Sequence, residues 1–447
     1  MAGSRSSVGV ELEFVVAVQQ KPGTFKKPAM FQDAPGGPIV LDSTQSIQLT
    51  VRDRMLDVIR EAIGDRRGDR VVASRQQISN NLNAWHLNNY TEWIVKRDMS
   101  VMMTGDVLSS DPNLQNFRWY DVEVTSPPLY ATDRSWDELR RVVDAIRQTF
   151  WVFCPDTSGL HIHYGRGIDW IPFADLRRIA AFIFAADPIL IQMQPEDRIT
   201  GDGASFCHSN RLYGAMAHGS PSSEVMEHLN ARNNEGAPET VSAANPSQNP
   251  KSKPKLERGT FIFNRGSLPG YTLDEDHFRD SNFAFNGRYV RVPGTVEGRP
   301  VNIPLGVREL LTCTNAPTLA RLMRDQHPAR FAYNFLAYDL ELYRRVVMER
   351  GMPNPNHQNR RTIEFRQNAG TMDPDEVIAH AKVVVRLCEY ASTIPLQELW
   401  KVVSDLHMAE SHRDWYDVFD LLTELDLVEE ARVIQRQIAK YRGIDLD

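Results

Sequence analysis

The chain has 447 residues, enough for one large enzyme-sized domain or up to about three smaller domains. Hydrophobic residues make up 42% and charged residues 24%, and no apolar run approaches the roughly 20 residues that a membrane-spanning helix needs. The 51 lysines and arginines stand against 58 aspartates and glutamates, a net charge of −7 that argues against an extended nucleic-acid-binding face. We therefore expect neither a membrane nor a nucleic acid as partner.

The four cysteines are widely spaced and form no CxxC pair. They are few for a secreted chain of this length, and the first residues lack the charged-then-apolar layout of a signal peptide. We expect free thiols in a reducing compartment, with the cytoplasm as the location. The cysteines are Cys154, Cys207, Cys313 and Cys388.

Short segments of period-two alternation are scattered among longer helical patterns, which favours an α+β fold over a regular strand–helix series. Apolar residues at helical spacing predict helices over 51–63, 135–151 and 173–186, packed on a sheet. From Asp373 onward the chain is helical in pattern, and Asp373 is the expected N-cap of the first of these helices.

One segment, 218–257, is rich in Ser, Asn, Pro, Glu and Lys and has almost no large apolar residue. Such a composition buries too little surface to offset the entropy lost on ordering, so it predicts a disordered insertion. Strand-like motifs lie on both sides of it, which argues against a domain boundary there. We expect a catalytic domain over 1–393 and a helical C-terminal extension over 394–447.

Two predicted strands carry carboxylates on one face. In GVELEFVV, Glu11 and Glu13 share a face because strand side chains alternate. In WYDVEVTSPPL, Asp121, Glu123 and Thr125 share a face in the same way. A solvated edge strand would explain either pair alone, but the apolar continuation of the first segment favours a central position.

Two further strands place other polar side chains on one face. In SGLHIHYG the paired residues are His161 and His163, and in RRTIEFRQNAGT they are Glu364 and Arg366. An ion pair within the strand is the simplest explanation of the last two. The four segments together nevertheless share one design, with an apolar face under helices and a polar face of carboxylates, histidines and arginine.

Clustered carboxylates repel one another in a partly buried site unless a divalent cation neutralises them, and oxygen ligands favour Mg²⁺ or Mn²⁺. An arginine beside such a site would attract a phosphate or carboxylate, because its planar fork can pair with either. A metal together with a phosphate indicates a nucleotide.

The motifs GVELEF, VEVTSPPL, SGLHIHYG and TIEFRQNAGTMD, in this order over 8–392, resemble the amidoligase family, which is related to glutamine synthetase and glutamate-cysteine ligase. The resemblance implies a curved, mainly antiparallel sheet with helices on one face and a concave catalytic face. It also implies an ATP- and Mg²⁺-dependent ligase that joins a small carboxylate substrate, such as an amino acid or peptide, to an amine through an acyl-phosphate.

The resemblance further implies metal ligands. Glu11 and Glu13 would be divided between two metal sites, and Glu123 would join Glu13. His161 and Glu364 would join Glu11 at the other site.

Other roles carried over by motif concern the nucleotide and the substrates. His163 would touch the ATP phosphates, and Arg366 would hold the transferred phosphoryl group or the substrate carboxylate. Asp98 with Ser100, in VKRDMSV, resembles an element whose acid faces the amine substrate. Arg211, in HSNRLYG, is a further candidate contact to substrate or phosphate.

The sequence departs from the family pattern at two points and leaves two alternatives open. Thr362 stands where an arginine is expected, and no third carboxylate is evident for the site of Glu13 and Glu123. A cupin would need a glutamate a few residues after His163, and an amidohydrolase barrel would need regular strand–helix alternation. A metal-dependent hydrolase and a non-catalytic nucleotide- or peptide-binding protein of the same fold remain as alternatives.

Overall fold

The structure is a computed structural model, and the contacts within it divide the chain into two compact units. The first unit comprises Met1–His163 and Asn368–Ala381, and the second comprises Tyr164–Gly351, Asn359–Gln367 and Lys382–Asp447, in each case for the residues described. The structure describes residues 6–20, 25–42, 46–64, 92–167, 169–200, 207–230, 261–270, 292–296, 299–324, 330–339 and 362–446.

Four strands form the main sheet of the first unit in the order β3-β4-β1-β7. Strand β1 (Ser7–Gln19) runs antiparallel to β4 (Arg118–Thr125), which in turn runs antiparallel to β3 (Ile94–Lys96). Strand β7 (Gly159–Gly165) belongs to this unit as far as His163. The strands predicted from the first three motifs are therefore confirmed.

Shorter strands extend β1. Strand β2 (Ile39–Val40) pairs with it in parallel, and β5 (Leu129–Tyr130) and β6 (Val152–Phe153) pair with it antiparallel. Because β1 has neighbours on both sides, it is buried over nearly its whole length. The burial fits the expected central position and explains its content of β-branched and aromatic residues.

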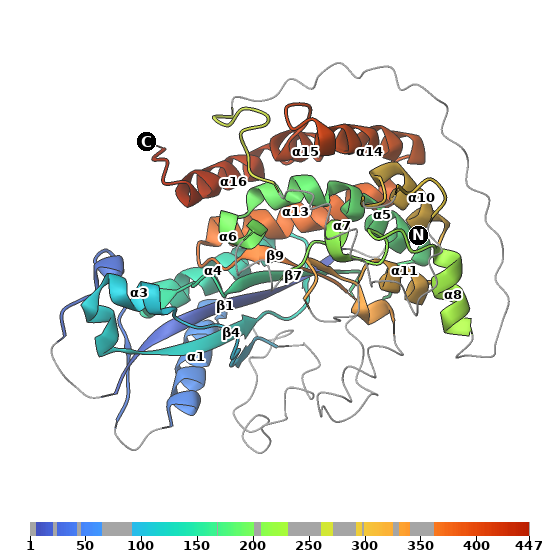
Figure 1. Cartoon of the computed structure of the whole chain (residues 1–447). Helices are drawn as coiled ribbons and strands as arrows, with labels where there is room; N and C mark the ends of the chain where they lie inside the picture. Colours follow the sequence, from blue (N-terminus) through green and yellow to red (C-terminus); the bar gives the residue numbers. More distant parts are fainter. Residues whose placement is uncertain are drawn as a thin grey trace. The chain divides into compact units, whose positions relative to one another are not determined.

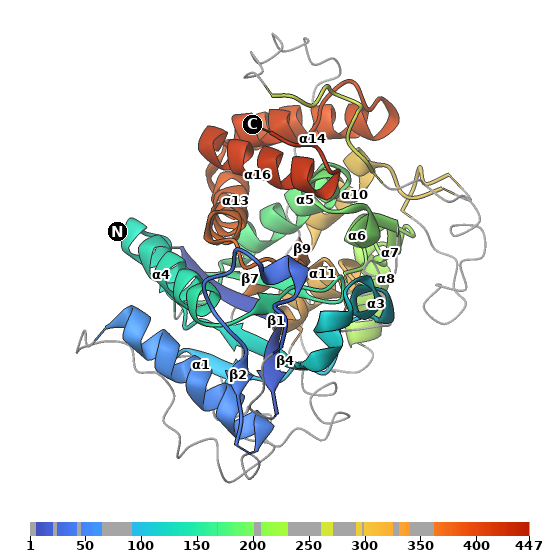
Figure 2. The same ribbon diagram turned by 90° about the vertical axis from the view of Figure 1, so that its left-hand side faces the viewer.

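Two helices of the first unit pack on each other, and Figure 2 shows them side by side. They are α1 (Ile47–Ile63) and α4 (Asp133–Thr149), and both were predicted from helical spacing. Each turns its apolar residues inward, as Met55 and Ile59 do in α1 and Val142 and Ile146 do in α4. This unit also contains α3 (Gly105–Ser110) and the 3-10 helices η1 (Ala29–Phe31) and η3 (Pro112–Asn116).

The second unit is built around α5 (Phe173–Leu190), whose residues from Ile179 onward are buried on every side. Such a helix is hydrophobic all round because neighbouring helices cover it completely. Its neighbours are α7 (Asn210–Tyr213), α10 (Ile303–Thr312), α11 (Ala316–Leu322), α14 (Leu396–Ser411) and α15 (Val418–Glu424). The second unit also contains η4 (Ile191–Met193), α6 (Glu196–Thr200), η7 (Leu336–Tyr338) and α16 (Val428–Tyr441).

The C-terminal residues are helical, as the sequence predicts, and Figure 1 shows α14, α15 and α16 following one another in red. Before them, α13 (Pro374–Thr393) begins in the first unit and continues into the second. Asp373 is its N-cap, since its Oδ1 accepts from the Asp375 amide at 2.8 Å. The boundary expected at 393/394 stays a prediction.

The fourth predicted strand is β9 (Ile363–Ala369), which pairs antiparallel with β8 (Tyr333–Asn334). The fold class is thus α+β with mainly antiparallel pairing, as the sequence predicts.

Among the residues described, no helix has the length and apolarity needed to span a membrane.

The expected insertion needs one correction. Its first part forms α8 (Ser222–Asn230), with Val225 and Leu229 buried, so the prediction of disorder is wrong there. The reason is that Val225 and Leu229, four positions apart, share one helix face that packs on α10 and α11, whereas the average composition of a long window conceals them. The rest of the expected insertion, 231–257, lies outside the described residues.

Candidate metal centre

Strand register brings the acidic side chains of the first unit into a row. Glu13 on β1 lies directly opposite Glu123 on β4, and Glu123 lies directly opposite Lys96 on β3. Directly opposite residues on one sheet face have neighbouring side chains. The row is almost dry, because Glu13 is 5% exposed and Glu123 is 4% exposed.

A third carboxylate joins this row. Asp98 follows β3, and one oxygen of each of Glu13, Asp98 and Glu123 lies within 4.8 Å of the other two. We call these three residues the acidic triad. Ser100 fixes the Asp98 carboxylate, since both its amide and its hydroxyl donate to Oδ1, at 2.8 Å and 2.6 Å.

The two histidines of β7 lie beside the glutamates of β1. His161 Nδ1 is 3.3 Å from Glu11 Oε2 and 3.4 Å from Glu13 Oε1, so this ring bridges both carboxylates. His163 Nε2 is 3.1 Å from Glu11 Oε1. The sequence predicted these four side chains on chemically active strand faces, and the structure brings them together.

Backbone and hydroxyl donors fix the glutamates further. The Gly159 amide donates to Glu13 Oε2 at 2.7 Å, and the Thr125 hydroxyl donates to Glu123 Oε1 at 3.1 Å. Glu123 Oε1 also lies 2.9 Å from Lys96 Nζ. Each glutamate of the acidic triad is therefore held in one orientation before any ligand arrives, which is what a preorganised site requires.

The pKa values of Glu123 and Asp98 are shifted in opposite directions. Burial raises the pKa of Glu123 above its ordinary value, although the Lys96 ammonium opposes this. Burial also acts to raise the pKa of Asp98, but the two hydrogen bonds from Ser100 and the nearby charges outweigh it, so that this pKa is lowered. A cation bound here would relieve the cost of keeping Glu123 charged.

The donor set fits a hard divalent cation. Three carboxylates supply oxygen ligands, and this chemistry suits Mg²⁺ or Mn²⁺ rather than a thiol-preferring metal. The sequence left the site of Glu13 and Glu123 without a third carboxylate and assigned Asp98 to the amine substrate. The geometry instead offers Asp98 as the missing third ligand.

Glu364 and Arg366 belong to the second unit, where they form an ion pair. Arg366 Nη1 donates to Glu364 Oε1 at 2.6 Å, and Asn334 Nδ2 donates to Glu364 Oε2 at 2.8 Å. Both carboxylate oxygens of Glu364 are thus engaged within this unit. The expected grouping of Glu364 with Glu11 and His161 stays a prediction.

Arg211 is 1% exposed, and its guanidinium is enclosed by other side chains of the protein. Its Nε is 2.9 Å from Glu410 Oε1, and its guanidinium stands over the Phe184 ring at 5.0 Å. Removing one partner of such a buried pair would leave an uncompensated charge, so the pair has a structural role of its own. Its expected contact with substrate or phosphate stays a prediction.

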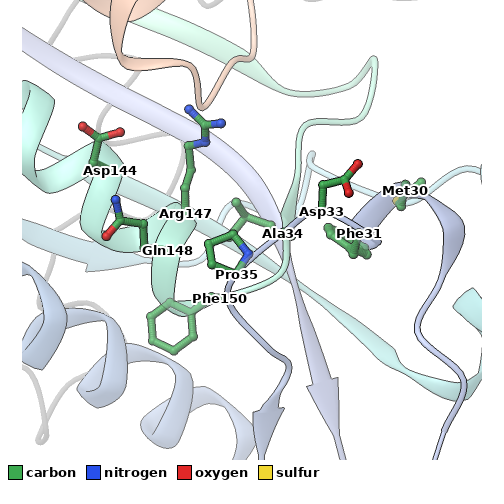
Figure 3. Close-up of a pocket in the computed structure, with 10 residues that line it drawn as sticks. Met30, Phe31, Asp33, Ala34, Pro35, Asp144, Arg147, Gln148 and Phe150 are labelled. Carbon is green, nitrogen blue, oxygen red and sulfur yellow. The ribbon is translucent and has the colours of Figure 1, made fainter.

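A surface depression of about 500 Å³ lies elsewhere in the first unit (Figure 3). Asp144, Arg147 and Gln148 of α4 form one wall, and Asp33 stands on the opposite wall. None of the predicted site residues lines it. Since Asp33, Arg147 and Gln148 are exposed, the depression is a feature of the surface, and we assign it no role.

Comparison with known proteins agrees with the motifs. Residues 4–210 match a protein-family model described as a putative amidoligase enzyme, which confirms the family resemblance of the first three motifs; the fourth motif, at 362–373, lies outside the matched range. The matched range contains every residue of the acidic triad and both histidines of β7. The family description names a ligase. No curated protein and no solved structure matches the chain.

Proposed function

We propose that this protein is an ATP- and Mg²⁺-dependent ligase that joins a carboxylate to an amine through an acyl-phosphate. The observation that carries the proposal is the acidic triad, whose three carboxylates lie within 4.8 Å of one another in the part of the chain that matches the amidoligase family. A curved sheet of the glutamine synthetase type, with the triad on its concave face, is part of this proposal.

The acidic triad would hold one Mg²⁺, and Glu11 with His161 would supply ligands to a second. Bound Mg²⁺ supplies charge neutralisation for phosphate oxygens during phosphoryl transfer. His163, whose Nε2 lies 3.1 Å from Glu11 Oε1, would donate to a phosphate oxygen, and Glu11 would orient its ring. Glu364 and Arg366 keep their proposed roles as metal ligand and phosphoryl contact.

The protein's own contribution to this reaction is positioning. Ser100 holds Asp98, Gly159 holds Glu13, and Thr125 holds Glu123, so that the ligands need little rearrangement when a cation binds. The substrates are proposed to be a small carboxylic acid, such as an amino acid or peptide, and a small amine.

The test is release of ADP and phosphate when the purified protein is incubated with ATP, Mg²⁺ and a panel of amino acids, peptides and amines. We expect release that requires both an acid and an amine, and its loss in Glu13→Gln. The matched control is Asp121→Asn, because Asp121 lies on the same strand face but pairs with Arg97 at 2.7 Å instead of joining the triad.

Two outcomes would contradict the proposal. Hydrolysis of an amide without consumption of ATP would favour a metal-dependent hydrolase. Binding of ATP with no ADP released under any substrate pair would favour a non-catalytic nucleotide-binding protein.

A further inference from the structure

Lys96 lies two residues before Asp98 of the acidic triad, and its ammonium contacts Glu123. It ends β3 and stands directly opposite Glu123, so Lys96, Glu123 and Glu13 follow one another across three neighbouring strands. Its Nζ lies 2.9 Å from Glu123 Oε1. The Glu123 side chain is 6% exposed and that of Lys96 is 30% exposed, so the pair is drier than an ordinary surface ion pair.

The charge of Lys96 reaches the acidic triad. Its ammonium contacts Glu123 directly, and one Glu123 oxygen lies within 4.8 Å of an oxygen of Asp98 and of Glu13, so its positive charge acts on the whole cluster. At this cluster of three carboxylates a bound divalent cation and the Lys96 ammonium would compete for the same oxygens.

The net charge of the metal centre depends on the acidic triad, the bound cation and Lys96 together. When all three carboxyl groups are ionised they carry three negative charges, of which one divalent cation neutralises two. The Lys96 ammonium neutralises the third, so that one divalent cation leaves the set without net charge. A trivalent cation would leave it positive, and removal of Lys96 would leave it negative with a divalent cation bound.

We propose that Lys96 is the counter-charge of the metal centre, and that its positive charge sets the preference of the acidic triad for a divalent over a trivalent cation. The inference rests on the proposed function, because it assumes that the triad binds a metal. It assigns a role to a side chain that the reaction itself does not require as a ligand.

The test is calorimetric titration of the folded protein at pH 8 with Mn²⁺ and with La³⁺, without nucleotide. In Lys96→Met, loss of the nearby positive charge should tighten Mn²⁺ binding roughly tenfold, the effect of about 1.4 kcal/mol of removed repulsion. La³⁺ binding should tighten by a larger factor, because repulsion grows with the charge of the ion. The ratio of the La³⁺ and Mn²⁺ affinities should therefore rise.

Two further variants separate charge from hydrogen bonding. Lys96→Gln keeps a donor for Glu123 and loses the charge, so it should shift the ratio as Lys96→Met does. Lys96→Arg keeps the charge, so its ratio of La³⁺ to Mn²⁺ affinity should equal that of the unaltered protein. Arg97→Met is the matched control, since it removes a neighbouring positive charge whose partner, Asp121, is outside the triad.

The outcomes are distinct. The counter-charge role would be overturned if Lys96→Gln had the same ratio of La³⁺ to Mn²⁺ affinity as the unaltered protein, or if Lys96→Met bound Mn²⁺ more weakly. Either result would leave the metal site intact. An equal shift in Arg97→Met would also overturn the counter-charge role, by showing a general effect of net charge. Failure of the unaltered protein to bind either ion would overturn the metal site and this inference together.

Discussion

The backbone amide of Gly159 donates a 2.7 Å hydrogen bond to Glu13 Oε2, which ties the start of β7 to the acidic triad. A side chain at position 159 has no room, because a Cβ there would lie 2.5 Å from His161 Nε2 and 3.2 Å from Glu13 Oε2. Glycine at this position thus lets the strand approach both side chains closely.

Gly159→Ala should therefore displace the His161 ring and loosen Glu13. We expect a loss of about 1–3 kcal/mol in the free energy of unfolding, the usual cost of overpacking a buried site, together with weaker Mn²⁺ binding. Gly37→Ala is the control, since no atom lies within 4 Å of a Cβ at that position. Denaturant unfolding and metal titration measure both effects, and unchanged Mn²⁺ affinity would refute the role assigned to Gly159.

The two histidines of β7 should differ in their effect on the triad. His161 bridges Glu11 and Glu13, whereas His163 lies against Glu11, which is outside the triad. His161→Ala should weaken Mn²⁺ binding by about 10- to 100-fold, the scale seen when a residue that orients a metal ligand is removed. His163→Ala should weaken ATP binding more than Mn²⁺ binding. Equal losses of Mn²⁺ affinity in the two variants would instead indicate a site built on both histidines.

Arg366 pairs with Glu364 through one nitrogen at 2.6 Å, which is compatible with either a structural or a catalytic role. Lysine keeps the charge but loses the planar fork, so Arg366→Lys should fold normally and lose turnover by about 10² to 10³, as when one preorganised donor is removed. Steady-state kinetics and melting curves test this. Near-normal turnover in Arg366→Lys, with a loss of stability in Arg366→Met, would show that the ion pair only stabilises the strand.

Much of this architecture follows from local pattern. Period-two alternation in the first three motifs predicted strands and the faces of Glu11 and Glu123, because strand geometry fixes which side chains point together. Register does not follow in the same way, so the direct pairing of Glu123 with both Glu13 and Lys96 could not be read from the sequence.

Side chains outside regular elements were harder to place. Asp98 lies after β3, where no periodicity indicates direction, and so its position beside Glu13 was not predicted. The partner of Arg211 is Glu410, 199 residues further along the chain, and a contact at that separation leaves no local signal. The strand motifs thus gave the elements that carry the site, whereas tertiary contacts completed it.

The pH dependence of the free energy of unfolding tests the environment of Asp187. It is fully buried in α5, and burial raises its pKa above the ordinary 3.8 even though the Ser209 hydroxyl and the Arg211 amide donate to it. The folded protein therefore binds this proton more tightly than the unfolded chain, so that this stabilisation is lost as pH rises from about 4 through the raised pKa.

Asp187→Asn should remove this pH dependence, because an amide oxygen can still accept both hydrogen bonds and does not ionise. The free energy of unfolding of the variant relative to the unaltered protein should thus increase between pH 4 and pH 7. Urea unfolding at the two pH values measures the difference, and a difference that stays constant would show that Asp187 titrates normally.

The most direct test of the account is calorimetric Mn²⁺ binding to the unaltered protein and to Asp98→Asn, with Asp121→Asn as the control on the neighbouring strand. The acidic triad predicts that the unaltered protein and the control bind alike and that Asp98→Asn, which keeps the acceptor for Ser100 but loses the charge, binds at least tenfold more weakly. Equal affinity in all three proteins would contradict a metal centre at Glu13, Asp98 and Glu123.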